Sequence, residues 1–470
     1  MKKIIIQREQ WQARVAVVDN ENRLQDLYFE SRARPELEKC FLKGKISKIL
    51  PGIQTAFVDI GQSRSGFLHI TEVDRARTIE PLDGELEEEA VEAVSPEAPA
   101  LIPKSQMDIS KIFKEGDVIL VQVIKEPMGE KGAKLSTCFT LPGKFIVLMP
   151  NISQIGVSRK IEDAAERDRL KEIVTSYLPS GMGAIIRTTA ENKSRENITK
   201  DLAMLVSVWH SINKKFKKAE VGEKVHEDLP IPLRAVREHL DDDVEAVICD
   251  LQEDFQAAAR FIKYFMPEYL NVLRLYTDPM PVFDHFNIEK QINPLLDKKV
   301  QLKSGGTLVI ESTEAMTVID VNTGKFTGKG SMENTILTTN LEAAEEVVRQ
   351  LRLRNIGGLI VIDFIDMFKA SNRQKLSRFL EKTLKERDKF QSVTLKVSEF
   401  GLIQMTRKRS GRTLVQNLTD VCTTCHGNGF LKSAATEAYT VLSSVSRDIK
   451  RNPPQGRLTL HVAAACIIIC

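Results

Sequence analysis

The sequence predicts a multidomain α+β protein, and three patterns support this prediction. Short strand-like runs, punctuated by glycine and proline, fill residues 36–78 and 108–137. Apolar residues recur every three or four positions across 231–275, which is typical of helices. From 298 to 409 strand-like and helix-like segments alternate. At 470 residues the chain is also too long for a single core.

The composition is that of an ordinary globular protein with little overall charge. Hydrophobic residues make up 42% of the chain, charged residues make up 28%, and the formal net charge is +3. An acidic ligand must therefore be met by local basic patches. No apolar run approaches the roughly 18 residues needed to span a bilayer, and the N-terminus lacks the apolar segment of a signal peptide. We therefore expect a cytoplasmic protein.

Residues 36–137 are expected to form a small antiparallel barrel that contains an acidic loop. Runs such as QTAFVDIG, SGFLHI and DVILVQVIKE have the composition of strands and are separated by turn residues. Residues 79–105 are acidic, rich in proline and alanine, and contain no aromatic residue. This composition indicates a flexible insert. A mixed segment, 138–230, follows the barrel and closes with the basic run NKKFKKAEVGEKV.

Two strand-like runs, TVIDVNTGKF and GGLIVIDFIDM, each reach an aspartate, Asp320 and Asp363. The segment between them has one apolar helical face, so a helix can pack on a sheet that both strands join. The two carboxylates can then lie side by side at one edge of that sheet. Asn322 points to the same strand face as Asp320. Two alternatives remain: each aspartate caps a turn, or Asp366 replaces one of them as a ligand.

Two close carboxylates repel each other, which favours protonation of one of them or a bound cation. Oxygen ligands suit Mg²⁺, which keeps water ligands for a phosphate substrate. The chemistry that this pattern predicts is phosphodiester hydrolysis, in which the metal activates a water molecule.

The cysteines fall into two groups. In a cytosolic chain, seven cysteines argue against a disulfide framework, and we expect Cys40, Cys138 and Cys249 to be buried free thiols. Cys422 and Cys425, in CTTCHGNG, have the spacing of half a zinc site. A zinc ion shared between two chains, a redox dithiol and an accidental pair all remain open. His426 is too close to Cys425 to complete the site, and Cys466 and Cys470 make a poor second pair.

These motifs together resemble the ribonuclease E/G family. The resemblance is carried by TEAMTVIDVNTGKF, TTNLEAAEEVVRQLRLRNIGGLIVIDFIDM and CTTCHGNG, and upstream by LPGIQTAFVDIGQSRSGFLHI, LPGKFIVLMP, GVSRKIE and IIRTTAEN. It covers nearly the whole chain. It implies an endoribonuclease that uses Mg²⁺ to cut single-stranded, A/U-rich RNA in rRNA processing and mRNA decay, stimulated by a 5′-monophosphate. The alternative is a non-catalytic S1-type RNA-binding or scaffolding protein.

The resemblance also implies a domain layout. An RNase H-like subdomain would be split by an inserted S1 barrel of the OB type, and a DNase I-like subdomain would carry out catalysis. The expected parts are an RNase H-like subdomain (1–35 and 231–297), an S1 domain (36–137), a 5′-sensor subdomain (138–230), a catalytic subdomain (298–417), a zinc-link (418–430) and a small, apparently truncated domain (431–470).

By motif match, each part has candidate residues. Asp320 and Asp363 would hold Mg²⁺ with help from Asn322, and Cys422 and Cys425 would share Zn²⁺ across a homodimer that could assemble further. The RNA contacts of the barrel would be Phe57, Phe67, Lys125 and Lys131, although such phenylalanines also occur in cores and such lysines on any surface. A terminal phosphate would be bound by Gly143, Val147, Arg159, Arg187 and Thr188, with Gly143 allowing close approach of the backbone.

Overall fold

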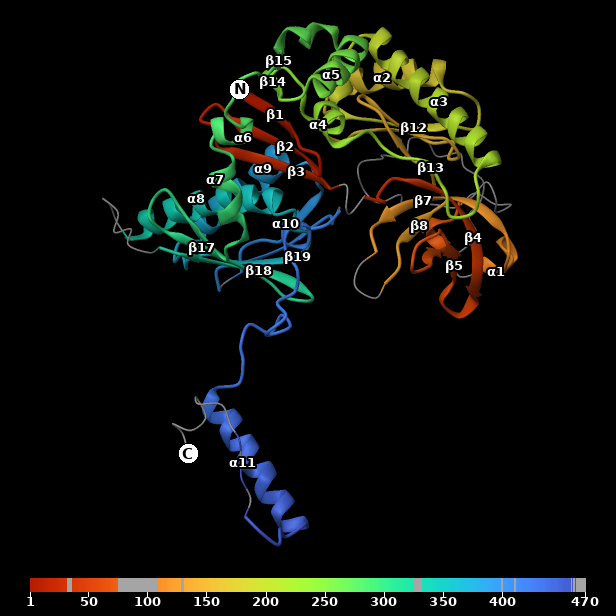
Figure 1. Ribbon diagram of the computed structural model, residues 1–470. Coiled ribbons are helices and arrows are strands. Elements are labelled where there is room, and N and C mark those ends of the chain that lie inside the picture. Colours follow the sequence, from red (N-terminus) through yellow and green to blue (C-terminus); the bar gives the residue numbers. More distant parts are fainter. Residues whose placement is uncertain are drawn as a thin grey trace. The chain divides into compact units, whose positions relative to one another are not determined.

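The computed structural model describes most of the chain and divides it into two compact units, Met1–Leu414 and Val415–Cys470 (Figure 1). The described residues are 1–31, 36–74, 108–127, 131–323, 332–398, 400–409, 411–457, 459 and 461. The acidic insert at 79–105 and the pair Cys466 and Cys470 lie outside them. No helix in these described ranges is long and apolar enough to cross a membrane.

The first sheet joins the N-terminus to a segment more than two hundred residues away. Its order is β15 (Leu273–Leu275), β14 (Val244–Cys249), β1 (Lys2–Arg8), β2 (Gln12–Asp19) and β3 (Leu24–Ser31). β1 pairs parallel with β14 and antiparallel with β2. Around this sheet lie α4 (Ile231–His239), α5 (Gln252–Phe265), α6 (Val282–His285), α7 (Glu289–Ile292) and the 3₁₀ segments Pro267–Val272 and Asn293–Leu296.

The expected barrel is present as a closed ring of five strands. The ring consists of β4 (Phe41–Leu50), β5 (Thr55–Asp59), β6 (Gly66–His69), β8 (Lys134–Ser136) and β7 (Val118–Lys125), and the β4–β7 pairing closes it. β13 (Lys224–His226) extends the sheet beside β4. The interior is filled by alternate residues such as Ala56, Val58 and Leu68. Short helices lie at Pro51–Ile53, Ile70–Glu72 and α1 (Ile109–Ile112). The mixed α+β class and the barrel are thus confirmed.

A four-stranded sheet follows the barrel in sequence. Its order is β11 (Ile155–Val157), β12 (Gly183–Ile186), β10 (Ile146–Met149) and β9 (Leu141–Pro142). Two helices, α2 (Ala164–Tyr177) and α3 (Arg195–Lys218), pack on it, and a 3₁₀ turn spans Thr188–Ala190. Asp163 and Ser194 cap the first turns of the two helices through backbone N–H groups.

The last sheet of the first unit has six strands. Its order is β16 (Lys299–Gln301), β17 (Thr307–Ser312), β18 (Met316–Asn322), β19 (Gly358–Asp363), β21 (Leu402–Arg407) and β20 (Ser392–Thr394). β18 and β19 are parallel, and the crossover between them contains α8 (Met332–Leu353). The core between this sheet, α8 and α9 (Ala370–Arg387) contains Ile319, Ile362, Val347 and Leu380.

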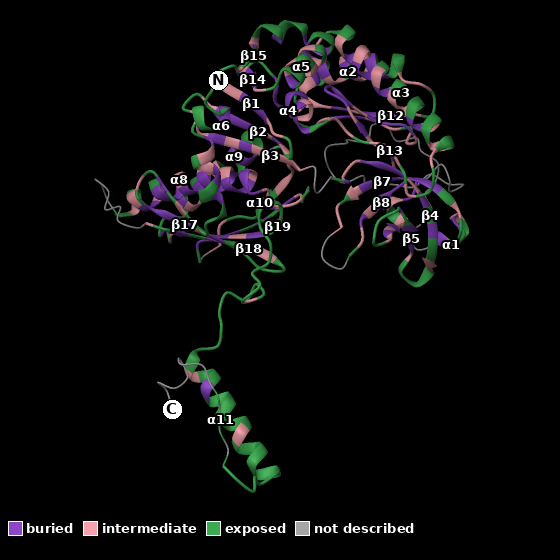
Figure 2. Ribbon diagram, viewed as in Figure 1, coloured by how far each residue is buried: buried purple, intermediate pink, exposed green. Residues whose placement is uncertain are grey.

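The second unit carries the Cys422–Cys425 turn and α11 (Ala434–Arg451), which follows α10 (Leu414–Leu418) in sequence. α11 is largely exposed in the single chain, as its green ribbon in Figure 2 shows. Its exposed apolar side chains include Tyr439, Leu442 and Ile449.

Helical periodicity was the wrong interpretation for part of 231–275. Residues 244–249 form strand β14, which lies between β15 and β1 in the first sheet. A short apolar run buried on both faces cannot be separated from a helix by periodicity alone. Among the lone cysteines, Cys40 and Cys249 are buried free thiols as expected, whereas Cys138 is only half-buried.

Candidate active site and phosphate pocket

Two aspartates meet where the parallel strands β18 and β19 run side by side. Asp320 and Asp363 are register partners across this pair. Ile319 and Ile362, one position earlier, belong to the core under α8 and α9, so alternation directs both aspartates to the opposite face. Both are exposed there. The crossover helix between the strands is what makes this parallel register possible.

On the same face, the Asn322 amide supports Asp320, and the ionised form of Asp363 is destabilised. Asn322 Nδ2 donates a hydrogen bond of 2.8 Å to Asp320 Oδ2, which fixes that carboxylate. Partial burial raises the pKa of Asp363, and the negative charges of Asp320 and Asp366 raise it further. A site that raises the pKa of an acid in this way also favours a cation between the carboxylates.

The loop that follows Asp363 is held by α8. The amide of Asn340, which is fully buried, donates to the Ile365 carbonyl at 2.8 Å and accepts from the Ile365 N–H at 3.1 Å. Gly401, with φ of +75°, lies against this loop, where a Cβ would be 2.8 Å from the Phe364 oxygen. These contacts leave Asp366 exposed in the loop, beyond the end of β19.

On the barrel, the two candidate phenylalanines are neighbours. Phe57 on β5 and Phe67 on β6 are register partners, and both are half-buried on the face opposite the barrel core. Lys125 ends β7, and both it and Lys131 are exposed. Lys134, which the sequence did not single out, pairs in register with Phe67 and forms an ion pair with Glu72.

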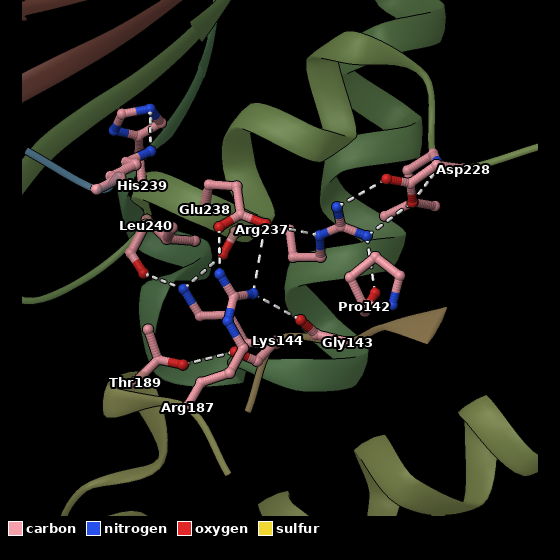
Figure 3. Close-up of polar contacts among 12 residues, drawn as sticks. Pro142, Gly143, Lys144, Arg187, Thr189, Asp228, Arg237, Glu238, His239 and Leu240 are labelled. Carbon is pink, nitrogen blue, oxygen red and sulfur yellow. Dashed lines mark hydrogen bonds and ion pairs between the residues drawn. The ribbon is translucent and has the colours of Figure 1, made fainter. Parts of the chain in front are cut away.

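Arg187 is the centre of a polar cluster beside the four-stranded sheet (Figure 3). Its Nη1 donates to the Gly143 carbonyl at 2.8 Å and to Glu238 Oε1 at 3.3 Å, and its Nη2 donates to Glu238 Oε2. The Arg187 backbone N–H is bonded to the Phe145 carbonyl at 2.9 Å. The sequence thus identified Gly143 and Arg187, which the structure brings together, but it missed Glu238.

A buried carboxylate fixes the turn at Gly143. Asp201 on α3 is fully buried and accepts from the backbone N–H groups of Lys144, Phe145 and Ile146 at 3.2, 2.7 and 3.0 Å. A Cβ on Gly143 would lie 2.5 Å from Asp201 Oδ2. The structure therefore requires glycine at this position for a reason independent of any ligand.

A buried lysine ties this turn to the end of α4. Lys144 Nζ donates to the carbonyls of Arg237 and Leu240 at 2.8 and 2.7 Å, as Figure 3 shows. Burial, together with the nearby charge of Arg187, lowers the pKa of Lys144 to about 7. Arg237 is also buried and forms an ion pair with Asp228. The two Lys144 bonds join residues that are 93 and 96 positions apart in the chain.

The other three candidate residues for phosphate binding lie on different elements of the structure. Val147 is on β10, and Thr188 directly follows Arg187 at the start of the 3₁₀ turn. Arg159 lies beyond β11 and is exposed. Within the described ranges, Arg159 has no hydrogen bond or ion pair to the other four candidates.

In the second unit, the two cysteines lie in one tight turn. The His426 N–H donates to the Cys422 carbonyl at 2.8 Å, and the Asn428 N–H donates to the Cys425 carbonyl at 2.9 Å. Hydrogen bonds from the backbone of Cys425 and Thr424 lower the pKa of the Cys422 thiol to about 7. Among the residues that the structure describes, no group of three or more histidine, cysteine, aspartate and glutamate side chains is arranged to bind a metal.

Similarity to known proteins extends over most of the chain. Residues 140–410 match the model of the Ribonuclease E/G family. Over 436 residues, 93% of this chain, the sequence is 37% identical to Ribonuclease G of Escherichia coli (strain K12), covering 86% of that protein. It is 35% identical to Ribonuclease E of Haemophilus influenzae in an alignment of 473 positions, which covers the whole of this chain and 48% of that protein. The chain therefore belongs to the ribonuclease E/G family.

Proposed function

We propose that this protein is an endoribonuclease that hydrolyses phosphodiester bonds of single-stranded, A/U-rich RNA. The observation that carries the proposal is the register pairing of Asp320 with Asp363, with Asn322 bonded to Asp320 on the same open face. Family membership supports the same activity, because the related proteins are named ribonucleases. A protein that only binds RNA would need no such pair of carboxylates.

The residues at this face fit a Mg²⁺ ion. Both acids are oxygen donors on adjacent strands, and partial burial, followed by the charges of Asp320 and Asp366, raises the pKa of Asp363. Asp320 and Asp363 would hold the ion, which would supply an acidified water and neutralise charge on the scissile phosphate. Asn322 keeps the Asp320 carboxylate in one orientation, so that less reorganisation is needed when RNA binds.

The barrel and the Arg187 pocket would position the substrate. The adjacent faces of Phe57 and Phe67 would stack bases, each stack contributing roughly 1–3 kcal/mol, and Lys125 and Lys131 would contact phosphates. Arg187 and Thr188 would bind a 5′-monophosphate, because a guanidinium fork matches phosphate oxygens. Binding at this pocket would increase cleavage without reading sequence.

We further propose the domain layout and assembly that the family resemblance implies. The sheet shared by residues 2–31 and 244–275 would be the RNase H-like subdomain, and the six-stranded sheet would be DNase I-like. Cys422 and Cys425 would each supply a thiolate to Zn²⁺ shared between two chains. A Cys422 pKa of about 7 supports this role, because thiolate is the ligating form.

The catalytic assignment is tested by Asp363→Asn. The variant should lose cleavage of a short 5′-phosphorylated A/U-rich RNA in Mg²⁺ while its RNA affinity stays within a few-fold. Glu311→Gln, on the neighbouring strand β17, is the matched control and should cleave normally. Parallel loss of cleavage and affinity in Asp363→Asn would contradict the assignment.

The pocket is tested separately by Arg187→Ala. We expect it to remove the preference for 5′-monophosphorylated over 5′-hydroxyl RNA, since Arg187 is the proposed phosphate ligand and its guanidinium is bonded to the Gly143 carbonyl. Equal slowing of both substrates would rule out a sensing role.

A further inference from the structure

The Arg187 guanidinium is already bound to an anion of the protein. The two carboxylate oxygens of Glu238 each accept a hydrogen bond from one of the two Nη atoms of Arg187. This is the bidentate geometry in which arginine binds carboxylates and phosphates alike. The pair is only partly shielded, because the side chains of Arg187 and Glu238 retain 25% and 23% of their exposure. Glu238 thus lies where solvent and a ligand can reach the same guanidinium.

One edge of the guanidinium is still open. A guanidinium has five N–H donors, and the contacts to Glu238 and Gly143 use those of Nη1 and one of Nη2. In the described part of the chain, no acceptor is bonded to Nε of Arg187. A phosphate that binds this arginine would therefore accept hydrogen bonds from Nε and from the remaining N–H of Nη2. This edge of the guanidinium is next to the edge that is bonded to Glu238.

Glu238 is also fixed in place and stays ionised. Lys144 holds the carbonyls of Arg237 and Leu240, on either side of Glu238, and Arg237 Nε donates to Glu238 Oε1 at 3.1 Å. Burial would raise the pKa of Glu238, but the charges of Arg187, Arg237 and Lys389 outweigh burial and hold it far below its usual range. The carboxylate therefore cannot lose its charge by protonation at neutral pH.

We propose that Glu238 is a specificity-determining residue of the 5′-phosphate pocket. Its carboxylate and the 5′-phosphate of the RNA would bind the same Arg187 guanidinium. This inference rests on the proposed function, because it assigns the phosphate to Arg187. Glu238 holds the guanidinium in its binding orientation and at the same time repels the incoming phosphate. The pocket is thereby ordered before RNA arrives, yet it binds the 5′ end weakly enough to release it.

Removing the charge of Glu238 should strengthen binding of the 5′-phosphate. Glu238→Gln keeps an oxygen acceptor for Arg187 but removes one negative charge from the edge beside the phosphate. Repulsion between two anions on neighbouring edges of one guanidinium then disappears. Because part of the pair is open to water, the screened gain corresponds to roughly three- to tenfold tighter binding of the phosphorylated end.

The experiment measures binding apart from cleavage. A 3′-labelled A/U-rich RNA, 2′-O-methylated at every position so that it cannot be cut, is prepared with a 5′-monophosphate and with a 5′-hydroxyl. Fluorescence anisotropy gives the affinity ratio of the two RNAs for the wild-type protein and for Glu238→Gln. Asp241→Asn is the matched control, because it removes a charge close to the same helix end but pairs with Lys2. Inorganic phosphate serves as a competitor for both proteins.

We expect Glu238→Gln to raise the affinity ratio by roughly three- to tenfold, to lower the inhibition constant of inorganic phosphate, and to lose this gain at high salt. Asp241→Asn should keep the wild-type ratio. An unchanged or smaller ratio in Glu238→Gln, with a wild-type protein that prefers the monophosphate, overturns the inference alone. A wild-type protein that cleaves RNA but shows no preference overturns both the 5′-phosphate pocket and this inference, while the nuclease assignment stands.

Discussion

Replacing Gly143 by alanine tests whether Asp201, rather than the approach of a ligand, requires glycine at this turn. The added Cβ would lie 2.5 and 2.6 Å from the two Asp201 oxygens, whereas ordinary contacts begin at 3.4 Å. The carboxylate must therefore move by about 0.9 Å, the difference between these distances. The hydrogen bond from the Lys144 N–H to Asp201 is already 3.2 Å long, and such a shift takes it beyond hydrogen-bonding range. The bonds from the Phe145 and Ile146 N–H groups become longer.

The expected cost follows from these bonds. A hydrogen bond to a charged group contributes about 1.5–3 kcal/mol, so loss of one bond and weakening of two others costs about 3 kcal/mol. A cost of about 3 kcal/mol increases the local opening equilibrium of the turn roughly a hundredfold. The cost is local, so it should be measured at these amides rather than from a single melting temperature of a multidomain chain.

Native-state hydrogen exchange is the appropriate assay, because it reports local opening. Peptides that contain Phe145 and Ile146 should exchange roughly a hundredfold faster in Gly143→Ala, while barrel peptides should not change. Gly52→Ala is the control, since its added Cβ would meet no atom within 4 Å. Wild-type exchange in Gly143→Ala, combined with loss of 5′-phosphate preference, would refute the reasoning and indicate that the glycine serves the ligand.

Four further predictions follow from the described contacts. Asn340→Leu removes the partner of the Ile365 N–H and carbonyl in the loop after Asp363, so local opening of this loop should become easier by about 2–4 kcal/mol in native-state hydrogen exchange; unchanged exchange of the Ile365 amide would contradict the contact. Burial and neighbouring carboxylates raise the pKa of Asp363, so this acid becomes protonated at a higher pH than an ordinary aspartate does. As the pH falls, the affinity for Mg²⁺, measured by calorimetry without RNA, should therefore begin to weaken at a higher pH. Equal affinity at pH 7 and pH 5 would argue against this. Phe57→Ala should weaken RNA binding by about 1–3 kcal/mol in anisotropy, and an unchanged affinity would return this ring to a structural role. Cys422→Ser should elute as a monomer on a sizing column, whereas a dimer peak would exclude the zinc link.

Local patterns in the sequence were sufficient to predict several elements. Alternation placed Asp320 and Asn322 on one face, and the helical segment between the aspartates allowed both strands to join one sheet, as β18 and β19 do. The strands of the barrel could also be predicted from the sequence, because each has one buried face. These features depend on residues close together in the chain, where side-chain period alone carries the information.

Local pattern failed where both faces of an element are buried or where partners are distant. Strand β14 was read as helix because its apolar residues are nearly continuous. Glu238 and Asp201 gave no motif, since each is an ordinary acid on a helix until folding brings it to Arg187 or Gly143. Their roles arise from bonds that span 51 to 57 residues.

The sequence by itself determined the family, the α+β class, the two aspartates on neighbouring strands and the two-cysteine motif, because each is encoded in contiguous residues. Only the tertiary structure decided that Arg187 already binds a carboxylate and that Gly143 must be glycine. Both follow from close contacts between segments far apart in the chain, and distance in space is the quantity that sequence spacing does not contain.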